Sequence, residues 1–168
     1  MTAHPKIRIF GVEDWQTYKR LRLRALADSP DAFGSTLARE ENRPDTEWQS
    51  RLRGDDASWN LPLFVEAGGE PVGLAWGRIV LEAPEIAHLY QMWVAPTHRG
   101  LGLGRRLLNT VIDWAKEKNT RYLDLGVTLR DSPAMQLYLR SGFKPVGEPE
   151  ALRPGSKLLG QAMRLDLG

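Results

Sequence analysis

Apolar residues along this chain change their spacing several times, and each spacing predicts a different element. Alternating or continuous apolar runs predict strands at residues 6–10, 63–67, 72–81, 85–94, 121–127, 144–146 and 158–165. Apolar positions three and four residues apart predict helices over residues 13–27, 45–53, about 105–119 and 132–141, with Asp45 as the cap of the second. Residues 28–44 are rich in Pro, Gly, Ser, Asp and Asn, and we expect a loop with little regular structure there.

The order of these elements predicts an α+β fold, a mixed and mainly antiparallel sheet with helices on both faces. No repeat, linker or low-complexity segment divides the chain, so we expect a single domain over residues 1–168.

The segment from Val94 to Arg106 carries the most informative pattern. Pro96 ends the preceding strand, because proline cannot donate to a ladder. Gly100, Gly102 and Gly104 follow at alternate positions, and an amphipathic helix begins directly afterwards. A strand, a glycine loop and a helix N-terminus in this order bring backbone N–H groups and a positive dipole to one place. The sequence therefore predicts a site for a phosphate-bearing ligand.

Two common phosphate loops do not fit this segment. A P-loop needs Gly-Lys-Ser/Thr, whereas Gly104 is followed by two arginines. The dinucleotide fingerprint would need glycine at Leu103 or Leu107.

What remains is R-G-x-G-x-G with a preceding V-x-P, which resembles the acetyl-CoA loop of the GCN5-related N-acetyltransferases. Residues 131–143 resemble the second motif of that family, N-x-x-A-x-x-L-Y-x-x-x-G-F, with Asp131 in place of the usual Asn. Residues 21–37 are similar to the first helix and following loop of many bacterial members. The resemblance covers essentially the whole chain and is specific in residues 85–143. It implies a twisted sheet of the GNAT type and acetyl-CoA as co-substrate.

The resemblance also implies which residues bind that co-substrate. Backbone groups near the end of one strand would contact the acetyl and pantetheine part, and the glycine loop would wrap the pyrophosphate. The residues implied are Met92, Trp93, Val94, Arg99, Gly100, Leu101, Gly102, Leu103, Gly104, Arg105, Asp131 and Tyr138. Arg106, beside the loop, is assigned with Arg99 and Arg105 to the phosphates.

Tyr138 matches the tyrosine acid of the family, since a phenol is protonated at neutral pH and can donate to a departing thiolate. The base is open. One family position for a glutamate is occupied here by Gly126, and another by His88, whose imidazole has a suitable pKa. Glu82 and Glu85 are close to it in sequence, and a water relay is a further alternative.

Strand alternation places His88, Tyr90, Met92 and Val94 on one face, with Gln91 and Trp93 on the other. Trp76 and Trp93 lie on strands that would flank the acceptor, and Phe33-Gly34-Ser35 lies in a segment that walls the acceptor site in similar proteins.

The reaction implied is direct transfer of acetyl to a primary amine, on a small molecule or a protein N-terminus. A non-catalytic acyl-CoA-binding or sensing module on the same fold is the alternative from another class. The resemblance is also compatible with a homodimer.

Composition narrows the remaining classes. The chain has 42% hydrophobic and 26% charged residues and no cysteine, which excludes disulfides and a cysteine nucleophile. The net charge is +2, and Arg20, Arg22 and Arg24 are interpreted as a solvated helix face rather than a nucleic-acid site. The dispersed histidines predict no metal site. With no apolar run of membrane length and no leader pattern, we expect a cytoplasmic protein that binds neither membrane nor nucleic acid.

Overall fold

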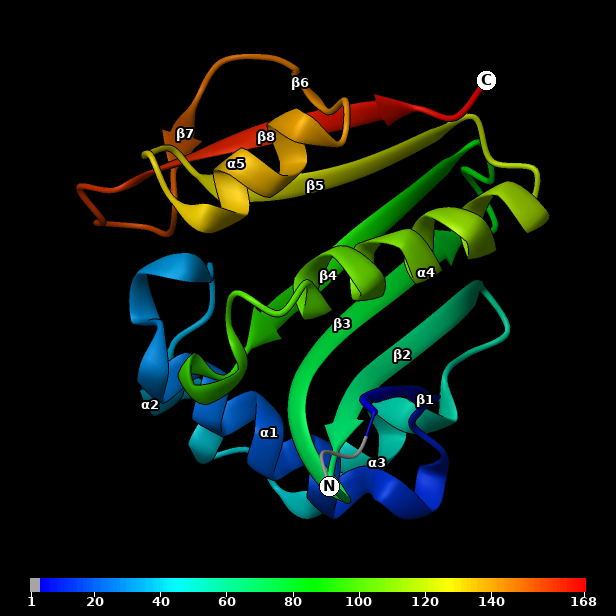
Figure 1. Cartoon of the computed structure of the whole chain (residues 1–168), viewed down its shortest axis with the longest axis vertical. Coiled ribbons are helices and arrows are strands. Elements are labelled where there is room, and N and C mark those ends of the chain that lie inside the picture. The colour runs from blue at the N-terminus through cyan, green and yellow to red at the C-terminus, as the bar shows by residue number, and fades with distance from the viewer. Residues whose placement is uncertain (1–3) are drawn as a thin grey trace.

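The computed structural model describes residues 4–168, whose strands form one continuous sheet (Figure 1). The strands are β1 (Lys6–Ile9), β2 (Ser58–Ala67), β3 (Glu70–Val80), β4 (Ile86–Val94), β5 (Tyr122–Thr128), β6 (Lys144–Pro145), β7 (Glu150–Ala151) and β8 (Leu159–Asp166). The helices are α1 (Trp15–Asp28), α2 (Leu37–Glu41), α3 (Asp45–Arg53), α4 (Leu103–Glu117) and α5 (Pro133–Arg140). Short 3-10 turns occur at Val12–Asp14, Pro30–Ala32 and Pro96–His98.

The strand order is β1-β2-β3-β4-β5-β8-β6, and β7 also pairs with β8. Every pairing is antiparallel except that of β4 with β5. The mixed, mainly antiparallel α+β fold predicted from the sequence is therefore confirmed.

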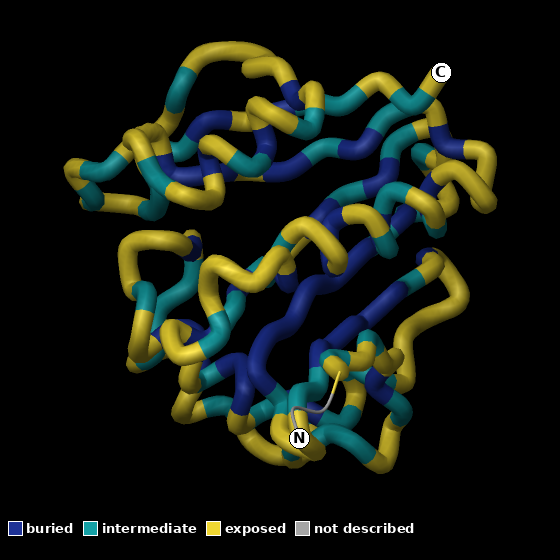
Figure 2. The backbone as a smooth tube through the Cα atoms, in the orientation of Figure 1, coloured by how far each residue is buried: buried dark blue, intermediate teal, exposed yellow. Residues whose placement is uncertain are grey.

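Helices cover both faces of the sheet. A side chain at Gly77 on β3 would come within 2.9 Å of the Trp114 ring, so α4 packs closely there. The neighbouring Trp76 has its ring 5.3 Å from that of Tyr18 in α1. Adjacent strand residues point to opposite faces, so α4 and α1 lie on opposite sides. Figure 2 shows β2 and β3 as largely buried along their central residues.

Local sequence accounts for the helices that bound the site. Leu107, Leu108, Val111 and Ala115 give α4 its buried face at a spacing of one to four residues. Ser132 caps α5 by accepting from the backbone N–H of Met135 at 3.1 Å. No helix formed by residues 4–168 combines the length and apolar composition that crossing a membrane requires.

Three expectations about element bounds were wrong. Residues 28–44 are not an irregular loop, because Thr36 caps α2 through the Arg39 N–H at 3.2 Å. Asp45 is the first helical residue of α3 and makes no cap bond, and Pro44 holds the cap position. β2 starts at Ser58 instead of Leu63, since residues 58–62 already pair with β3.

The fourth correction concerns β4, whose alternation is broken by a bulge. Tyr90 pairs with Trp76 and Trp93 pairs with Leu74, so Gln91 and Met92 together oppose a single residue of β3. Gln91 adopts a left-handed backbone conformation with φ 59°. Paired residues share a face, and Tyr90 and Trp93 therefore point to the same side. The prediction that Trp93 faces away from His88 and Tyr90 was wrong because it assumed an unbroken strand.

Candidate active site

The site lies where β4 and β5 separate. Their parallel pairing runs only from Ile86↔Tyr122 to Leu89↔Leu125, and the two strands then diverge (Figure 1). A cleft of about 2020 Å³ occupies this opening, and its lining includes residues of both strands and of α5, residues 98–100 and 102–105, and Ser29 with residues 32–35. This exceeds the usual ~300–1,000 Å³ of a small-ligand pocket. The cleft is therefore large enough for a long ligand together with a second molecule.

One end of the cleft is the glycine loop, residues 99–105, which leads into α4. Gly100 and Gly102 have φ of 78° and 77°, a conformation that favours glycine. Among residues 4–168, no acceptor is found for the backbone N–H groups of residues 99–105. Open donors at a helix N-terminus are suited to a phosphate anion. The donor set thus fits the pyrophosphate expected from the sequence.

The arginines beside this loop do not act alike. Arg99 donates through Nη2 to Asp28 Oδ2 at 2.8 Å and through Nε to the Val94 carbonyl at 2.9 Å. It therefore braces the loop against α1 and β4. Arg105 lines the cleft. Arg106 instead bonds to the Pro5 carbonyl at 3.1 Å and does not line the cleft, so its assignment to phosphate was wrong.

Asp28, at the end of α1, connects this helix to Trp93 of β4 and to Arg99 of the glycine loop. Its Oδ2 accepts from the Ser29 hydroxyl at 2.7 Å, the Trp93 indole N–H at 3.0 Å and Arg99. The Ser29 hydrogen bond contributes most to lowering the pKa of Asp28, and the bonds from Trp93 and Arg99 act in the same direction. The carboxylate therefore stays ionised and fixes the ends of α1 and β4 together.

Met92, Trp93 and Val94 line the cleft, as expected. Past Leu89, the edge of β4 that faces β5 has no strand partner among the described residues. Its backbone groups can therefore meet a ligand. This arrangement supplies candidate donors for an oxyanion without any charged side chain.

Three expected site residues lie outside the cleft lining. The Leu101 side chain is exposed, so this residue offers the site only its backbone N–H. Asp131 accepts from Gln136 Nε2 at 2.8 Å at the start of α5. Glu85 is exposed just before β4, and its carbonyl accepts from the backbone of residues 121 and 122. The structure does not bring the Glu85 carboxylate to the site.

Tyr138 reaches the cleft from α5 and is 5% exposed. Its ring lies edge-on to Phe143 with 5.7 Å between centroids. Within residues 4–168 its hydroxyl makes no hydrogen bond, and burial raises its pKa above the usual value for tyrosine. The phenol is therefore protonated at neutral pH, and its proton is available to a ligand.

His88 lies on the α1 side of the sheet and lines the cleft. Its ring stacks on Tyr90 with 5.8 Å between centroids and 10° between planes. Burial lowers the pKa of His88, and the neighbouring Asp124 carboxylate opposes this effect. Arg164 holds Asp124 by two bonds of 2.8 and 2.9 Å. The imidazole is therefore neutral near pH 7 and able to accept a proton.

Residues 29–35 contribute one wall of the cleft. Phe33, Gly34 and Ser35 all line it, as expected. The wall is attached to the β5–β8 half of the sheet, since Thr128 Oγ1 donates to the Asp31 carbonyl at 2.6 Å and Arg153 Nη1 donates to that of Phe33 at 2.7 Å.

A second, smaller cavity lies beside the cleft. It has a volume of about 570 Å³ and shares Tyr90 and Gln91 with the cleft. Trp76 lines this cavity, whereas Trp93 lines the cleft. Of the two tryptophans expected to flank the acceptor, one is therefore in the cleft itself and the other beside it.

Sequence reasoning missed two residues at the site and misplaced a third. Gln91, at the bulge, lines the cleft, and Arg164 orients Asp124. Arg22 is only 5% exposed, so the expectation of a solvated arginine face was wrong for this residue. Its position, one turn after Tyr18 and one residue after Leu21, already belongs to the buried stripe of α1. That spacing was the signal that could have found it.

Fold and site together give a cleft between diverging strands, with open N–H donors at one end that suit a phosphate group. The family model described as "Acetyltransferase (GNAT) family" matches residues 21–143, and the chain belongs to this family. The streptothricin acetyltransferase of Streptomyces lavendulae is 35% identical over 115 residues, which are 64% of this chain and 57% of that protein. The matched stretch spans 38–57% of the first four curated relatives.

Solved structures share the fold. One is yncA from Salmonella typhimurium with its cofactor acetyl-CoA, at 22% identity and a TM-score of 0.75, covering 99% of this chain and 95% of that chain. Another is spermidine N-acetyltransferase from Vibrio cholerae with CoA and spermine, at 19% identity and a TM-score of 0.75, covering 97% and 95%.

Proposed function

We propose that the protein transfers the acetyl group of acetyl-CoA to a primary amine, by direct attack of the amine while both substrates are bound. The observation that carries this proposal is the set of open N–H donors on the glycine loop, at one end of a cleft that Tyr138 and His88 also line. Acetyl-CoA supplies a thioester carbon for the amine to attack and a thiolate that leaves.

The glycine loop would bind the pyrophosphate through its backbone N–H groups, which explains why its side chains matter little. The open edge of β4 from Met92 to Val94 would orient the carbonyl and stabilise negative charge that develops on its oxygen. Donors fixed by the strand need no reorganisation during the reaction. The protein would therefore act mainly by positioning and by electrostatics.

Two side chains would move protons. An alkylamine is mostly protonated at pH 7 and must lose a proton before it attacks. His88 would accept that proton, directly or through a water, because its lowered pKa leaves the imidazole neutral. Tyr138 would donate its hydroxyl proton to the departing sulfur and regain one from solvent.

The acceptor would enter from the side of the sheet that faces α1, between residues 29–35 and Tyr90. His88 and Trp93 point to this side, whereas α4 and the glycine loop belong to the other. The acceptor class proposed here is an amine on a small molecule or on a protein N-terminus.

The test is release of CoA from acetyl-CoA in the presence of a panel of amines and peptides, read with a thiol-reactive dye. The chain contains no cysteine, so the protein itself gives no signal. Release that depends on one acceptor class would support the proposal. Tight acetyl-CoA binding with no release from any acceptor would favour an acyl-CoA-binding or sensing module. Absence of binding would overturn the assignment of the co-substrate.

A further inference from the structure

Arg22 is the unexplained charged group of the site. It lies on the buried face of α1, is 5% exposed, and lines the cleft. Its Nε and Nη1 atoms are buried and have no hydrogen-bond partner, and it forms no ion pair within residues 4–168. A buried guanidinium without a partner is costly, because it has lost water and gained nothing in return.

An aromatic ring stacks on this side chain. The Arg22 guanidinium carbon lies 4.6 Å from the centroid of Phe33, on the wall formed by residues 29–35. Such stacking fixes the plane of the guanidinium, while its Nε and Nη1 have no hydrogen-bond partner within the described chain. Burial lowers the pKa of Arg22, yet the group stays charged at neutral pH.

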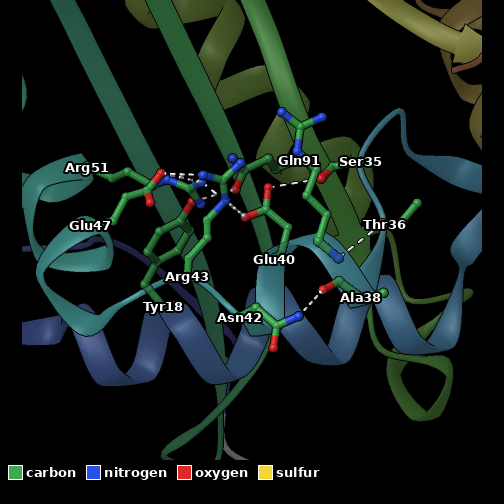
Figure 3. Close-up of polar contacts among 11 residues, drawn as sticks. Tyr18, Ser35, Thr36, Ala38, Glu40, Asn42, Arg43, Glu47, Arg51 and Gln91 are labelled. Carbon is green, nitrogen blue, oxygen red and sulfur yellow. Dashed lines mark hydrogen bonds and ion pairs between the residues drawn. The ribbon is translucent and has the colours of Figure 1, made fainter. Parts of the chain in front are cut away.

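Neighbouring acids do not neutralise Arg22, because other arginines occupy them (Figure 3). One carboxylate oxygen of Glu40 accepts a hydrogen bond from the Ser35 hydroxyl at 2.9 Å. The other accepts from Arg43 and Arg51 at 2.6 and 3.1 Å. Glu47 pairs with Arg43 as well. Arg43 and Arg51 therefore balance these two carboxylates, and Arg22 is left as a positive charge in excess.

The excess charge lies on the acceptor side of the site. Arg22 belongs to α1, which packs against Trp76, whereas α4 with the glycine loop packs against Gly77 on the opposite face. The open N–H donors of residues 99–105 already provide for the phosphates of a co-substrate. An anion that pairs with Arg22 must therefore come from the second substrate.

We propose that Arg22 binds a carboxylate of the acceptor, so that the preferred substrate is an amine that also carries a carboxylate. The planar edge of the guanidinium matches the two carboxylate oxygens, and the burial of Arg22 reduces the competition from water. This inference rests on the proposed acetyl transfer and narrows its acceptor class.

The test compares amines that differ only in that charge. Alanine, β-alanine and γ-aminobutyrate are each set against the corresponding primary amide, and peptides with Asp or Glu at the second position against those with Asn or Gln. We expect kcat/KM for a carboxylate form to exceed that for its amide by about ten- to a hundredfold, the worth of a charged hydrogen bond. The free acids and the peptides distinguish an amino-acid acceptor from a protein N-terminus.

The variant Arg22→Met keeps the length of the side chain and removes the charge, and Arg20→Met is the matched control, since Arg20 is exposed on the same helix. Arg22→Met should abolish the preference for the carboxylate, and Arg20→Met should retain it. Without ligand, Arg22→Met should melt no lower than the wild type, because loss of the stacking on Phe33 is offset by removal of a buried charge that has no hydrogen bond or ion pair within residues 4–168. With CoA present, carboxylate amines should raise the Tm of the wild type and of Arg20→Met, but not of Arg22→Met.

Two results would overturn the inference. One is equal use of acids and amides by the wild type; the other is a melting temperature that falls in Arg22→Met while the acceptor preference persists, which would make Arg22 a structural residue. Either can occur with acetyl transfer intact. If no amine releases CoA, the proposed function fails, and the Tm shift by carboxylate amines still decides whether Arg22 binds them.

Discussion

The hydroxyl of Tyr18 lies 3.0 Å from Oε1 of Gln91, and this bond joins the core of α1 to the residue at which β4 bulges. Tyr18 is fully buried, between the rings of Phe10, Trp48 and Trp76. The bulge that turns Trp93 toward the acceptor side is thus held from the helix as well as from the sheet.

We therefore expect Tyr18→Phe to lower the free energy of unfolding by about 1 kcal/mol, since the ring packing stays and one hydrogen bond goes. The Tm should fall by about 2–4 °C. Tyr122→Phe is the control, because Tyr122 is half-buried and makes no side-chain hydrogen bond within the described chain. Equal melting temperatures for the two variants would show that the bond to Gln91 contributes nothing.

Tyr138→Phe should reduce kcat by about 10²–10⁴-fold, the usual contribution of a general acid. The dissociation constant for acetyl-CoA should stay unchanged, because the hydroxyl makes no hydrogen bond to any of residues 4–168 and so does not hold the cleft together. The rate of CoA release is measured with the thiol-reactive dye, and acetyl-CoA binding is measured by calorimetry. A variant that turns over as fast as the wild type would remove Tyr138 as the acid.

His88 sets the expected pH dependence. The pKa of His88 is lowered from its ordinary 6.5, chiefly by burial, so the neutral base predominates from mildly acidic pH upward. The logarithm of kcat/KM should therefore rise with pH along a limb centred below 6.5 and then level until the acceptor amine titrates. His88→Gln should remove this limb. A limb that is unchanged in the variant would assign it to another group.

The free energy of unfolding should also depend on the protonation of His88, and it should decrease as the pH falls. Because the pKa is lower in the folded than in the unfolded chain, the unfolded chain binds the proton more readily. This contribution to stability is complete above the unfolded pKa of 6.5 and is lost as pH falls through the lower folded value. Thermal melts of the wild type and His88→Gln across this range would measure it, with a smaller decline expected in the variant.

Gly102→Ala tests the backbone of the glycine loop. At φ 77° a β-carbon is strained by about 1–2 kcal/mol, although nothing lies within 4 Å of its position. We expect a lower Tm together with weaker acetyl-CoA binding, since relief of the strain turns the N–H donors. Gly126→Ala, which also meets open space but has no positive φ, should leave the Tm unchanged or slightly raised. Identical melting of both variants would contradict the strain argument.

Most of the fold could be predicted from the sequence, because its signals are local. The spacing of Leu107, Leu108 and Val111 gives the buried face of α4, and Ser132-Pro133 with Gly142 gives both ends of α5. The glycines of the loop indicated an unusual backbone, and Gly100 and Gly102 do have positive φ. These features depend on residues only a few positions away, so the spacing of residue types in the sequence is enough to predict them.

The errors arose where distant residues decide. The bulge at Gln91 depends on pairing with β3 and on Tyr18, neither of which is visible in residues 86–94 themselves. Glu85 and Asp131 lie near the right places in sequence, yet their side chains are outside the cleft lining. Arg22 was assigned to solvent by its charge, although its helical position placed it inside.

The short pairing between β4 and β5 has a mechanical consequence. Four residues of each strand pair where the two halves of the sheet meet, and past this pairing side-chain bonds such as Thr128 to Asp31 also connect the halves. A ligand that fills the cleft would bridge this seam and couple the halves, since binding to the folded form alone adds stability in proportion to the logarithm of its concentration. Amide hydrogen exchange at residues 86–89 and 122–125 should therefore slow when substrates bind. Exchange at these paired residues would then report whether the cleft is occupied, although only some of them line it.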